Sequence, residues 1–246
     1  GTDTYKSIAD LPLNQRVKEM KKQDIKNKIL SEDPIKGSTF PLINRIGYSQ
    51  MYRFGSPPNY NPKPEHSIES LAKVSGVSSA ELAYDILLEN EGNNFIYAPL
   101  VNYADHTFGV CQKMLEDKNA IMGLGDGGAH VGFILDAGYP TWLISYWSVK
   151  KKVFSMEETI RRLTSDTASA AGLQDRGLLK VGLKADINII DWEKVGSSDP
   201  FMTQDLPAGG KRLMQHTQGY VATIVSGKIT YQNGKSTAER PGSLVK

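Results

Sequence analysis

The sequence predicts an α/β protein whose last third changes to antiparallel β-structure. Up to about residue 175, apolar residues recur at helical spacing in several segments. A short apolar run at 119–124 leads into a glycine-rich turn, as at the carboxyl edge of a parallel sheet. Beyond residue 175 apolar and polar residues alternate, which is the period of a half-buried strand. We therefore expect two parts, 1–175 and 176–246.

The composition is that of an ordinary globular protein. The chain has 246 residues, is 39% hydrophobic and carries a net charge of +2. This balance excludes wholesale disorder and gives no electrostatic reason to expect nucleic acid or an anionic membrane as partner. No apolar run is long enough to span a bilayer. The single cysteine, Cys111, lies in a helical pattern and cannot form an internal disulfide, so a reducing cytoplasm is the expected compartment.

The first part begins with a predicted helix and a long irregular segment. Residues 11–30 show roughly helical spacing of apolar side chains between lysines. Residues 31–66 are rich in proline and glycine, with room for short strands at 40–46 and 50–54. Long loops of this kind are often functional, so 31–66 is expected to be a surface excursion on the substrate side.

Two capping boxes fix the starts of later helices. Ser78 with Glu81, and Ser155 with Glu158, have the spacing in which a serine accepts a backbone N–H and the glutamate reaches back. The other elements expected here are helices at 68–74, 102–116 and 139–149, and strands at 94–98 and 119–124.

The second part reads as a small β-structure. A strand is predicted at 186–191. Strands 220–225 and 228–232 are expected to form a hairpin around Ser226-Gly227, followed by a second turn at Asn233-Gly234.

The sharpest local feature is the turn GDGGAH, from Gly125 to His130. Its glycines allow unusual backbone angles and a close approach by a ligand. Asp126 stands there without bulky neighbours and is suited to act as a general base. The alternative is a tight turn held by an Asx-type hydrogen bond. A phosphate cradle has little support because no Gly-Lys-Ser/Thr follows.

The remaining chemistry-bearing residues form no recognisable motif. The four histidines, His66, His106, His130 and His216, show neither H-x-H nor H-E-x-x-H spacing, so no metal ligand is predicted among them. No Gly-x-Ser-x-Gly elbow is present, and Cys111 lies within a predicted helix, so nucleophilic catalysis by serine or cysteine has little support.

Several longer strings resemble the amidohydrolase superfamily, and in particular its N-acyl-D-amino-acid deacylase (D-aminoacylase) branch. The strings general to many amidohydrolases are ADINIID and VSGK, and those more particular to this branch are GDGGAH and DLPAGG. The opening LPLNQRVKEMKKQDIKNKIL, the stretch MGLGDGGAHVGFILDAGYPTWLISYW and the ending RPGSLVK resemble the same branch. The likeness covers nearly the whole chain.

The resemblance implies a metal-dependent hydrolase with a (β/α)8 (TIM) barrel and a small β-sandwich. In such enzymes bound Zn²⁺ lowers the pKa of water to about 7 and polarises the amide carbonyl. An aspartate after the last barrel strand takes the proton from water and passes it to the leaving amine. Asp126 matches that aspartate by its motif.

The length conflicts with a complete barrel. A barrel of about 250 residues uses about 30 for each βα unit, so seven earlier units need roughly 200, whereas 125 residues precede Asp126. The family's H-x-H is also absent. We therefore expect the chain to correspond to the C-terminal half, with an incomplete barrel and part of the sandwich. Such a chain should be an inactive fragment, bind no catalytic zinc, and associate with itself or with a missing N-terminal half.

For function, the resemblance implies hydrolysis of the C–N bond of linear amides, with an N-acylated amino acid or a related amide as substrate. Asp126 would be the catalytic residue, and His130 and Arg53 would contact the substrate; Tyr48 and Tyr52 lie on the same excursion as Arg53. One alternative is a stand-alone, non-catalytic module that binds a ligand or a partner. Another keeps the superfamily but changes the substrate to a cyclic amide or an N-formyl amide.

Overall fold

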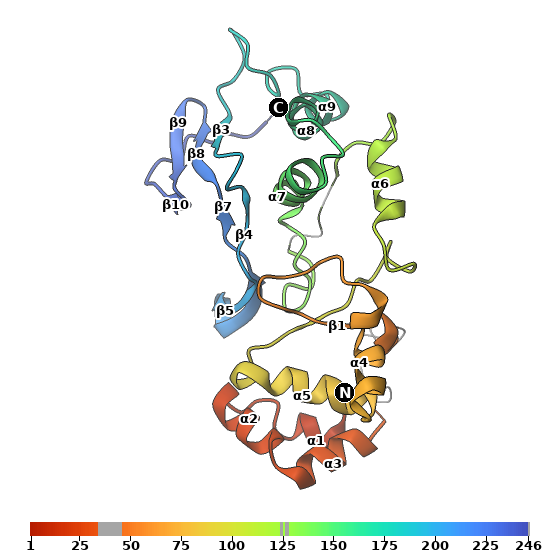
Figure 1. Cartoon of the computed structure of the whole chain (residues 1–246). Helices are drawn as coiled ribbons and strands as arrows, with labels where there is room; N and C mark the ends of the chain where they lie inside the picture. The colour runs from red at the N-terminus through yellow and green to blue at the C-terminus, as the bar shows by residue number, and fades with distance from the viewer. Residues whose placement is uncertain (34–45, 124, 126–127, 246) are drawn as a thin grey trace. The chain divides into compact units, whose positions relative to one another are not determined.

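The computed structural model describes residues 1–33, 46–123, 125 and 128–245. These form two compact units, Gly1–Met114 and Leu115–Lys246, each of which is described by itself (Figure 1). The division expected from the sequence near residue 175 stays a prediction. Within the described ranges, no helix is both long and apolar enough to cross a membrane.

The first unit is mainly helical, with one small pair of antiparallel strands. Its helices are α1 (Asp3–Lys6), α2 (Leu13–Met20), α3 (Gln23–Ser31), α4 (Ile68–Ser75), α5 (Ser79–Gly92) and α6 (Gly109–Glu116), the last ending in the second unit. The 3₁₀ turns are η2 (Tyr48–Gln50) and η3 (Pro64–His66), and the strands are β1 (Tyr52–Arg53) and β2 (Ile96–Tyr97). Strand β1 pairs antiparallel with β2, Tyr52 opposite Tyr97.

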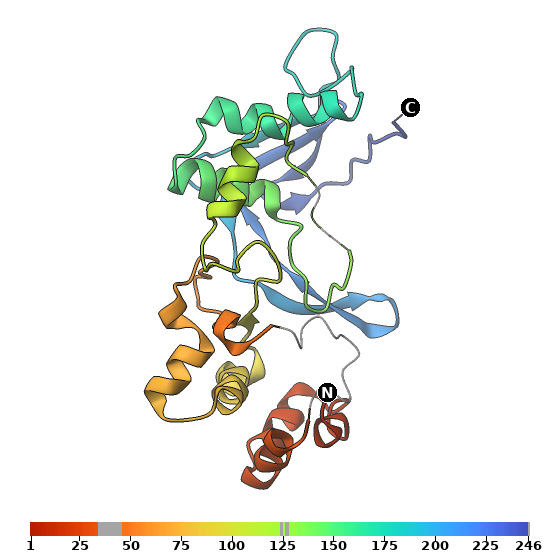
Figure 2. The same cartoon turned by 90° about the vertical axis from the view of Figure 1, so that its right-hand side faces the viewer.

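The helix expected at 11–30 is two helices, because Lys22 takes an extended backbone conformation between α2 and α3 (Figure 2). Helix α2 then packs closely on the end of α5. A Cβ on Gly92 would lie 2.5 Å from Cγ2 of Val17, and Gly92 has a φ of +79°. Glycine is therefore needed there both for space and for backbone conformation.

The core of the first unit lies between α4 and α5. Ile68, Ala83 and Ile86 are buried, and Met51, Leu82 and Ile96 pack against them. The predicted cap of α5 is confirmed, since the Glu81 N–H donates to Ser78 Oγ at 3.1 Å. Apolar residues at helical spacing on α4 and α5 thus pack against residues in and beside the β1–β2 pair.

An ion-pair network ties α3 to α5 and makes this packing pH-dependent. Lys26 Nζ lies 2.8 Å from Asp85 Oδ1 and 3.0 Å from Glu81 Oε1. Hydrogen bonding to Asp85, partly opposed by burial, raises the pKa of Lys26 above its ordinary 10.5. The stabilisation is therefore complete below pH 10.5 and is lost as the pH rises through the raised value.

We expect Lys26→Met to lower the urea midpoint of the helical signal near neutral pH, and this difference from wild type to shrink above pH 10.5. Circular dichroism at each pH measures it. Lys28→Met, also on α3 and without a described ion pair, is the control. A difference independent of pH would show that Lys26 acts through its aliphatic stem.

The second unit combines three helical segments with small antiparallel sheets. The helical segments are α7 (Tyr139–Trp142), which continues as the π-helix η4 (Leu143–Lys150), then α8 (Met156–Leu163) and α9 (Ser165–Ala170). The strands are β3 (Ile187–Ile190), β4 (Gly196–Ser197), β5 (Phe201–Leu206), β6 (Gly210–Met214), β7 (Thr217–Gln218), β8 (Tyr220–Val225), β9 (Lys228–Gln232) and β10 (Lys235–Ser236), with the 3₁₀ turn η5 (Pro207–Gly209) between β5 and β6.

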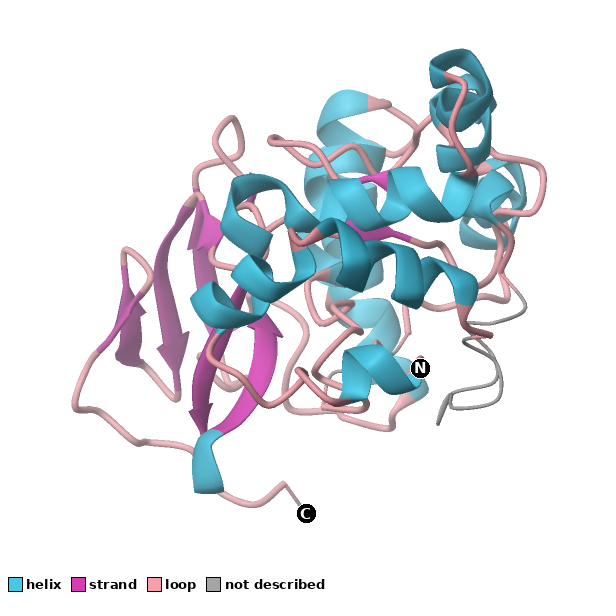
Figure 3. Ribbon diagram, turned by 90° about the horizontal axis from the view of Figure 1, so that it is seen from below, coloured by secondary structure: helices cyan, strands magenta, loops and turns pink. Residues whose placement is uncertain are grey.

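The predicted β-tail is confirmed. Strands β8 and β9 form the expected hairpin, and the four-stranded sheet has the order β10-β9-β8-β3 (Figure 3). Separate pairs join β4 to β7 and β5 to β6. Helices α7 to α9 lie beside the edge strand β3 (Figures 1 and 3). Leu143, Ile144 and Trp147 of η4 are buried and supply much of the unit's core.

Two predicted elements differ from the structure. The helix expected at 102–116 begins only at Gly109, because Asp105 and Thr107 form local side-chain turns, and Asn102 has a φ of +60°. The strand expected at 119–124 is absent over 119–123, where Asp117 also forms a local turn with the N–H of Asn119. The strand pairings within the described ranges are all antiparallel, and these ranges contain no closed barrel.

Candidate functional site

Gly125, the first residue of the glycine turn, is packed closely by the chain that follows the turn. Asp126, the predicted catalytic residue, lies outside the described residues. A Cβ on Gly125 would lie 2.7 Å from the carbonyl oxygen of Asp136 and 3.2 Å from the ring of Tyr139. Gly128 has a φ of +105°, which side-chain-bearing residues rarely adopt. Gly125 is thus required because no side chain fits there, and Gly128 is required because its backbone has a positive φ.

Gly125→Ala is expected to destabilise the second unit by about 1–3 kcal/mol, because the contacting atom is backbone and cannot rotate away. Gly132→Ala is the matched control, since a Cβ there meets nothing within 4 Å and its φ is not positive. Tryptophan fluorescence in urea measures both, since Trp142, Trp147 and Trp192 all belong to this unit. Equal stability of the two variants would contradict the packing described.

His130 is exposed and sits at the start of a turn. Its φ is +47°, its carbonyl accepts from the N–H groups of Phe133 and Ile134 at 3.0 Å, and its ring stacks on that of Phe133 at 5.3 Å. The ring is therefore ordered by its neighbour and still open to solvent. This placement suits the predicted contact with a substrate, which stays a prediction.

The sequence did not predict that the β5–β6 hairpin supports this turn. The Leu213 N–H of β6 donates to the carbonyl of Val131 at 2.8 Å. This bond joins Val131, the residue directly after GDGGAH, to the distant string DLPAGGKRLMQ. The sequence signal at the second string was its glycine pair, of which Gly209 has a positive φ, as does Ala208 before it.

Arg53 belongs to the first unit and has an ionic partner. Its Nη2 lies 2.6 Å from Glu89 Oε1, with both side chains partly exposed. A substrate carboxylate would therefore compete with Glu89 for this guanidinium. Tyr52, suggested as a further contact, is 1% exposed and its hydroxyl lies 2.5 Å from His106 Nδ1. Burial raises the pKa of Tyr52. Its ring packs against those of Tyr97 and Tyr103, so it belongs to an aromatic cluster.

The described histidines do not fit a metal site. The part of the chain that the structure describes contains no group of three or more His, Cys, Asp or Glu side chains able to hold a metal ion. His106 is engaged by Tyr52, and the ring of His216 packs on Phe201 at 4.9 Å. We therefore derive no catalytic step through a metal held by these residues.

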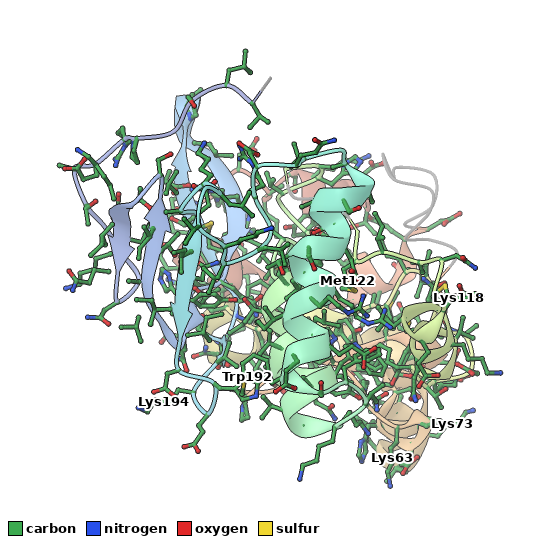
Figure 4. All side chains as sticks on the ribbon, turned by 90° about the horizontal axis from the view of Figure 1, so that it is seen from above. Lys63, Lys73, Lys118, Met122, Trp192 and Lys194 are labelled. Carbon is green, nitrogen blue, oxygen red and sulfur yellow. The ribbon has the colours of Figure 1, made fainter. Side chains whose placement is uncertain are left out.

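The segment that leads into the glycine turn lines a cleft of the second unit of about 810 Å³. Ile121 and Met122 line it together with Ile160 of α8 and Ile187 of β3. Figure 4 marks Met122 on this segment and Trp192 just after β3. Ile121 is 55% exposed, so apolar surface remains open where a strand was expected.

Comparison with known proteins assigns the chain to a family. The model of the Amidohydrolase family matches residues 45–231, so the chain belongs to this family. The match includes the glycine turn and most of the β-tail, and it confirms the resemblance to the amidohydrolase superfamily. Hydrolase chemistry is thus established at the level of the family.

Individual relatives match over shorter stretches. An N-acyl-D-aspartate deacylase of Alcaligenes xylosoxydans xylosoxydans is 29% identical over 96 residues, covering 39% of this chain and 18% of that protein. A dihydroorotase of Lactobacillus acidophilus is 35% identical over 89 residues, covering 35% and 20%, and one of Bacillus cereus is 42% identical over 89 residues, covering 34% and 20%. The matched part thus spans about a fifth of each relative. No solved structure matches.

Proposed function

We propose that this protein takes part in hydrolysis of the C–N bond of a linear amide, with an N-acylated amino acid as substrate. The observation that carries the proposal is the family match across the glycine turn, together with the deacylase relative and the branch-specific strings GDGGAH and DLPAGG. The Leu213 N–H donates to the carbonyl of Val131, so the residue directly after GDGGAH is bonded to a residue three positions after DLPAGG. This proximity supports a shared role for the two strings.

In this proposal Asp126 holds and transfers the proton, while His130 and Arg53 contact the substrate. Amidohydrolases are generally metal-dependent, and zinc is the ion expected from the resemblance. We also propose that the complete protein has the (β/α)8 barrel that the family resemblance implies, and that this chain supplies part of it. The metal ligands would come from further polypeptide with which this chain pairs, and the isolated chain would be inactive.

The test compares the isolated chain with the native protein purified from its source. Release of free amino acid from N-acetyl-D-aspartate and N-acetyl-D-leucine is measured with added zinc and with a chelator. We expect chelator-sensitive turnover by the native protein and none by the isolated chain. Native protein inactive on every N-acyl amino acid would contradict the substrate class. Chelator-sensitive turnover by the isolated chain would contradict the need for further polypeptide.

A cyclic amide is the second candidate substrate. The observation in its favour is the higher identity to the dihydroorotases, which reaches 42% over 89 residues. An assay of dihydroorotate hydrolysis, monitored through the loss of ultraviolet absorbance, distinguishes the cyclic amide from the linear amide as substrate. Turnover of dihydroorotate without turnover of N-acyl amino acids would establish this alternative in place of the first.

A further inference from the structure

A second cleft of the second unit, of about 570 Å³, has a different chemistry from the apolar one. It lies on the face of the four-stranded sheet that carries Asn188, Thr223 and Tyr231. Its other wall is the start of α7 and the segment 215–217. The volume lies in the range of small-molecule sites.

Among the described residues that line this cleft there is no Asp, Glu, Lys or Arg. The cleft lined by Ile121 and Met122 carries Arg161 and Asp186, and a cleft of the first unit carries Arg16 and Glu32. The imidazole in the present lining, His216, packs on the ring of Phe201. A charged ligand would therefore lose hydration in this neutral cleft without meeting a carboxylate, ammonium or guanidinium group. The chemistry therefore selects an uncharged ligand.

The lining offers many neutral hydrogen-bonding groups. The Thr223 hydroxyl donates to Asn188 Oδ1 at 2.9 Å, which fixes that amide and leaves its NH₂ as a donor. The side chains of Thr217, Tyr231 and Asn233 make no hydrogen bond with other described residues. Each of these groups both donates and accepts, as the hydroxyls of a sugar do.

Two tyrosines line the cleft, and Tyr231 is the more open of them at 49% exposure. The hydroxyl of the other, Tyr220, lies 2.9 Å from that of Thr141 and joins β8 to α7, so this part of the lining is held in place. An exposed phenol ring beside neutral donors suits the C–H face and the hydroxyls of a pyranose ring. We propose that this neutral cleft binds an uncharged sugar.

The experiment titrates the full chain with methyl β-D-glucopyranoside and follows amide shifts by NMR. A dissociation constant of about 1–10 mM is the scale expected of so small a ligand in an open site. Methyl β-D-glucuronide differs by one carboxylate and is expected to bind at least about tenfold more weakly. Absence of shifts in the cleft at about 50 mM glucoside, or equal binding of the two probes, would overturn the proposal.

Variants of one strand locate the binding. Tyr231→Ala should weaken glucoside binding about tenfold, while Ile229→Ala, on the same strand at 41% exposure and outside the lining, should leave it unchanged. If Tyr231→Ala disturbs the sheet, Asn188→Ala gives the same comparison on β3. Unchanged binding in both lining variants would refute this site.

Discussion

Under the proposed function, Asp126→Asn in the native protein is expected to lower kcat by about 10²–10⁴-fold while leaving the fold intact, because an amide cannot take up and release a proton near neutral pH. Initial rates of amide hydrolysis measure the loss, and circular dichroism checks the fold. The substitution also separates the two interpretations of the turn. An asparagine side-chain oxygen can still accept an Asx-type hydrogen bond, so a purely structural Asp126 would be replaced without loss.

Asp117→Asn is the matched control for this prediction. Asp117 is exposed and accepts from the Asn119 N–H at 2.8 Å, so it is an aspartate with the structural role alone. We expect that variant to keep full activity. If Asp126→Asn behaved in the same way, the catalytic assignment would be removed and the tight-turn interpretation would stand.

The parts of the fold that the sequence predicted are those fixed by local chemistry. The Glu158 N–H donates to Ser155 Oγ at 3.1 Å, as its capping box requires, and the Ser226-Gly227 turn joins β8 to β9. Such features involve residues within four positions of each other, so one segment contains all the information.

Of the parts that it did not predict, one depends on competing local turns and the others depend on contacts between distant segments. Periodicity extended the helix to residue 102, but the side-chain turns of Asp105 and Thr107 prevail there. The ionic partner of Arg53 is Glu89, and the support of the glycine turn is Leu213, neither of which is close in sequence. For the candidate site, a motif indicated the aspartate, whereas spacing alone gives no sign of which groups lie around it.

Arg162 is the second position where a large effect is expected, because one mostly buried guanidinium contacts three parts of the second unit. Its side chain is 12% exposed. Nε and Nη2 donate to Glu158 Oε1 at 3.1 and 3.0 Å, and Nη1 donates to the carbonyl of Leu115 at 2.7 Å. Its Cζ also lies 4.6 Å from the centre of the Phe154 ring. The arginine therefore anchors the segment that leads toward the glycine turn onto α8.

We expect Arg162→Met to destabilise the second unit by about 2 kcal/mol, since it leaves a part-buried carbonyl and a partly exposed carboxylate without their donor. Arg161→Met is the control on the same helix. Its side chain is 53% exposed and its pair with Asp166 at 2.5 Å lies at the surface, so its loss should cost at most about 1 kcal/mol. Urea unfolding followed by tryptophan fluorescence measures both. Equal losses would mean that Arg162 contributes only as a surface charge, and that packing of the apolar helix faces alone holds Leu115 against α8.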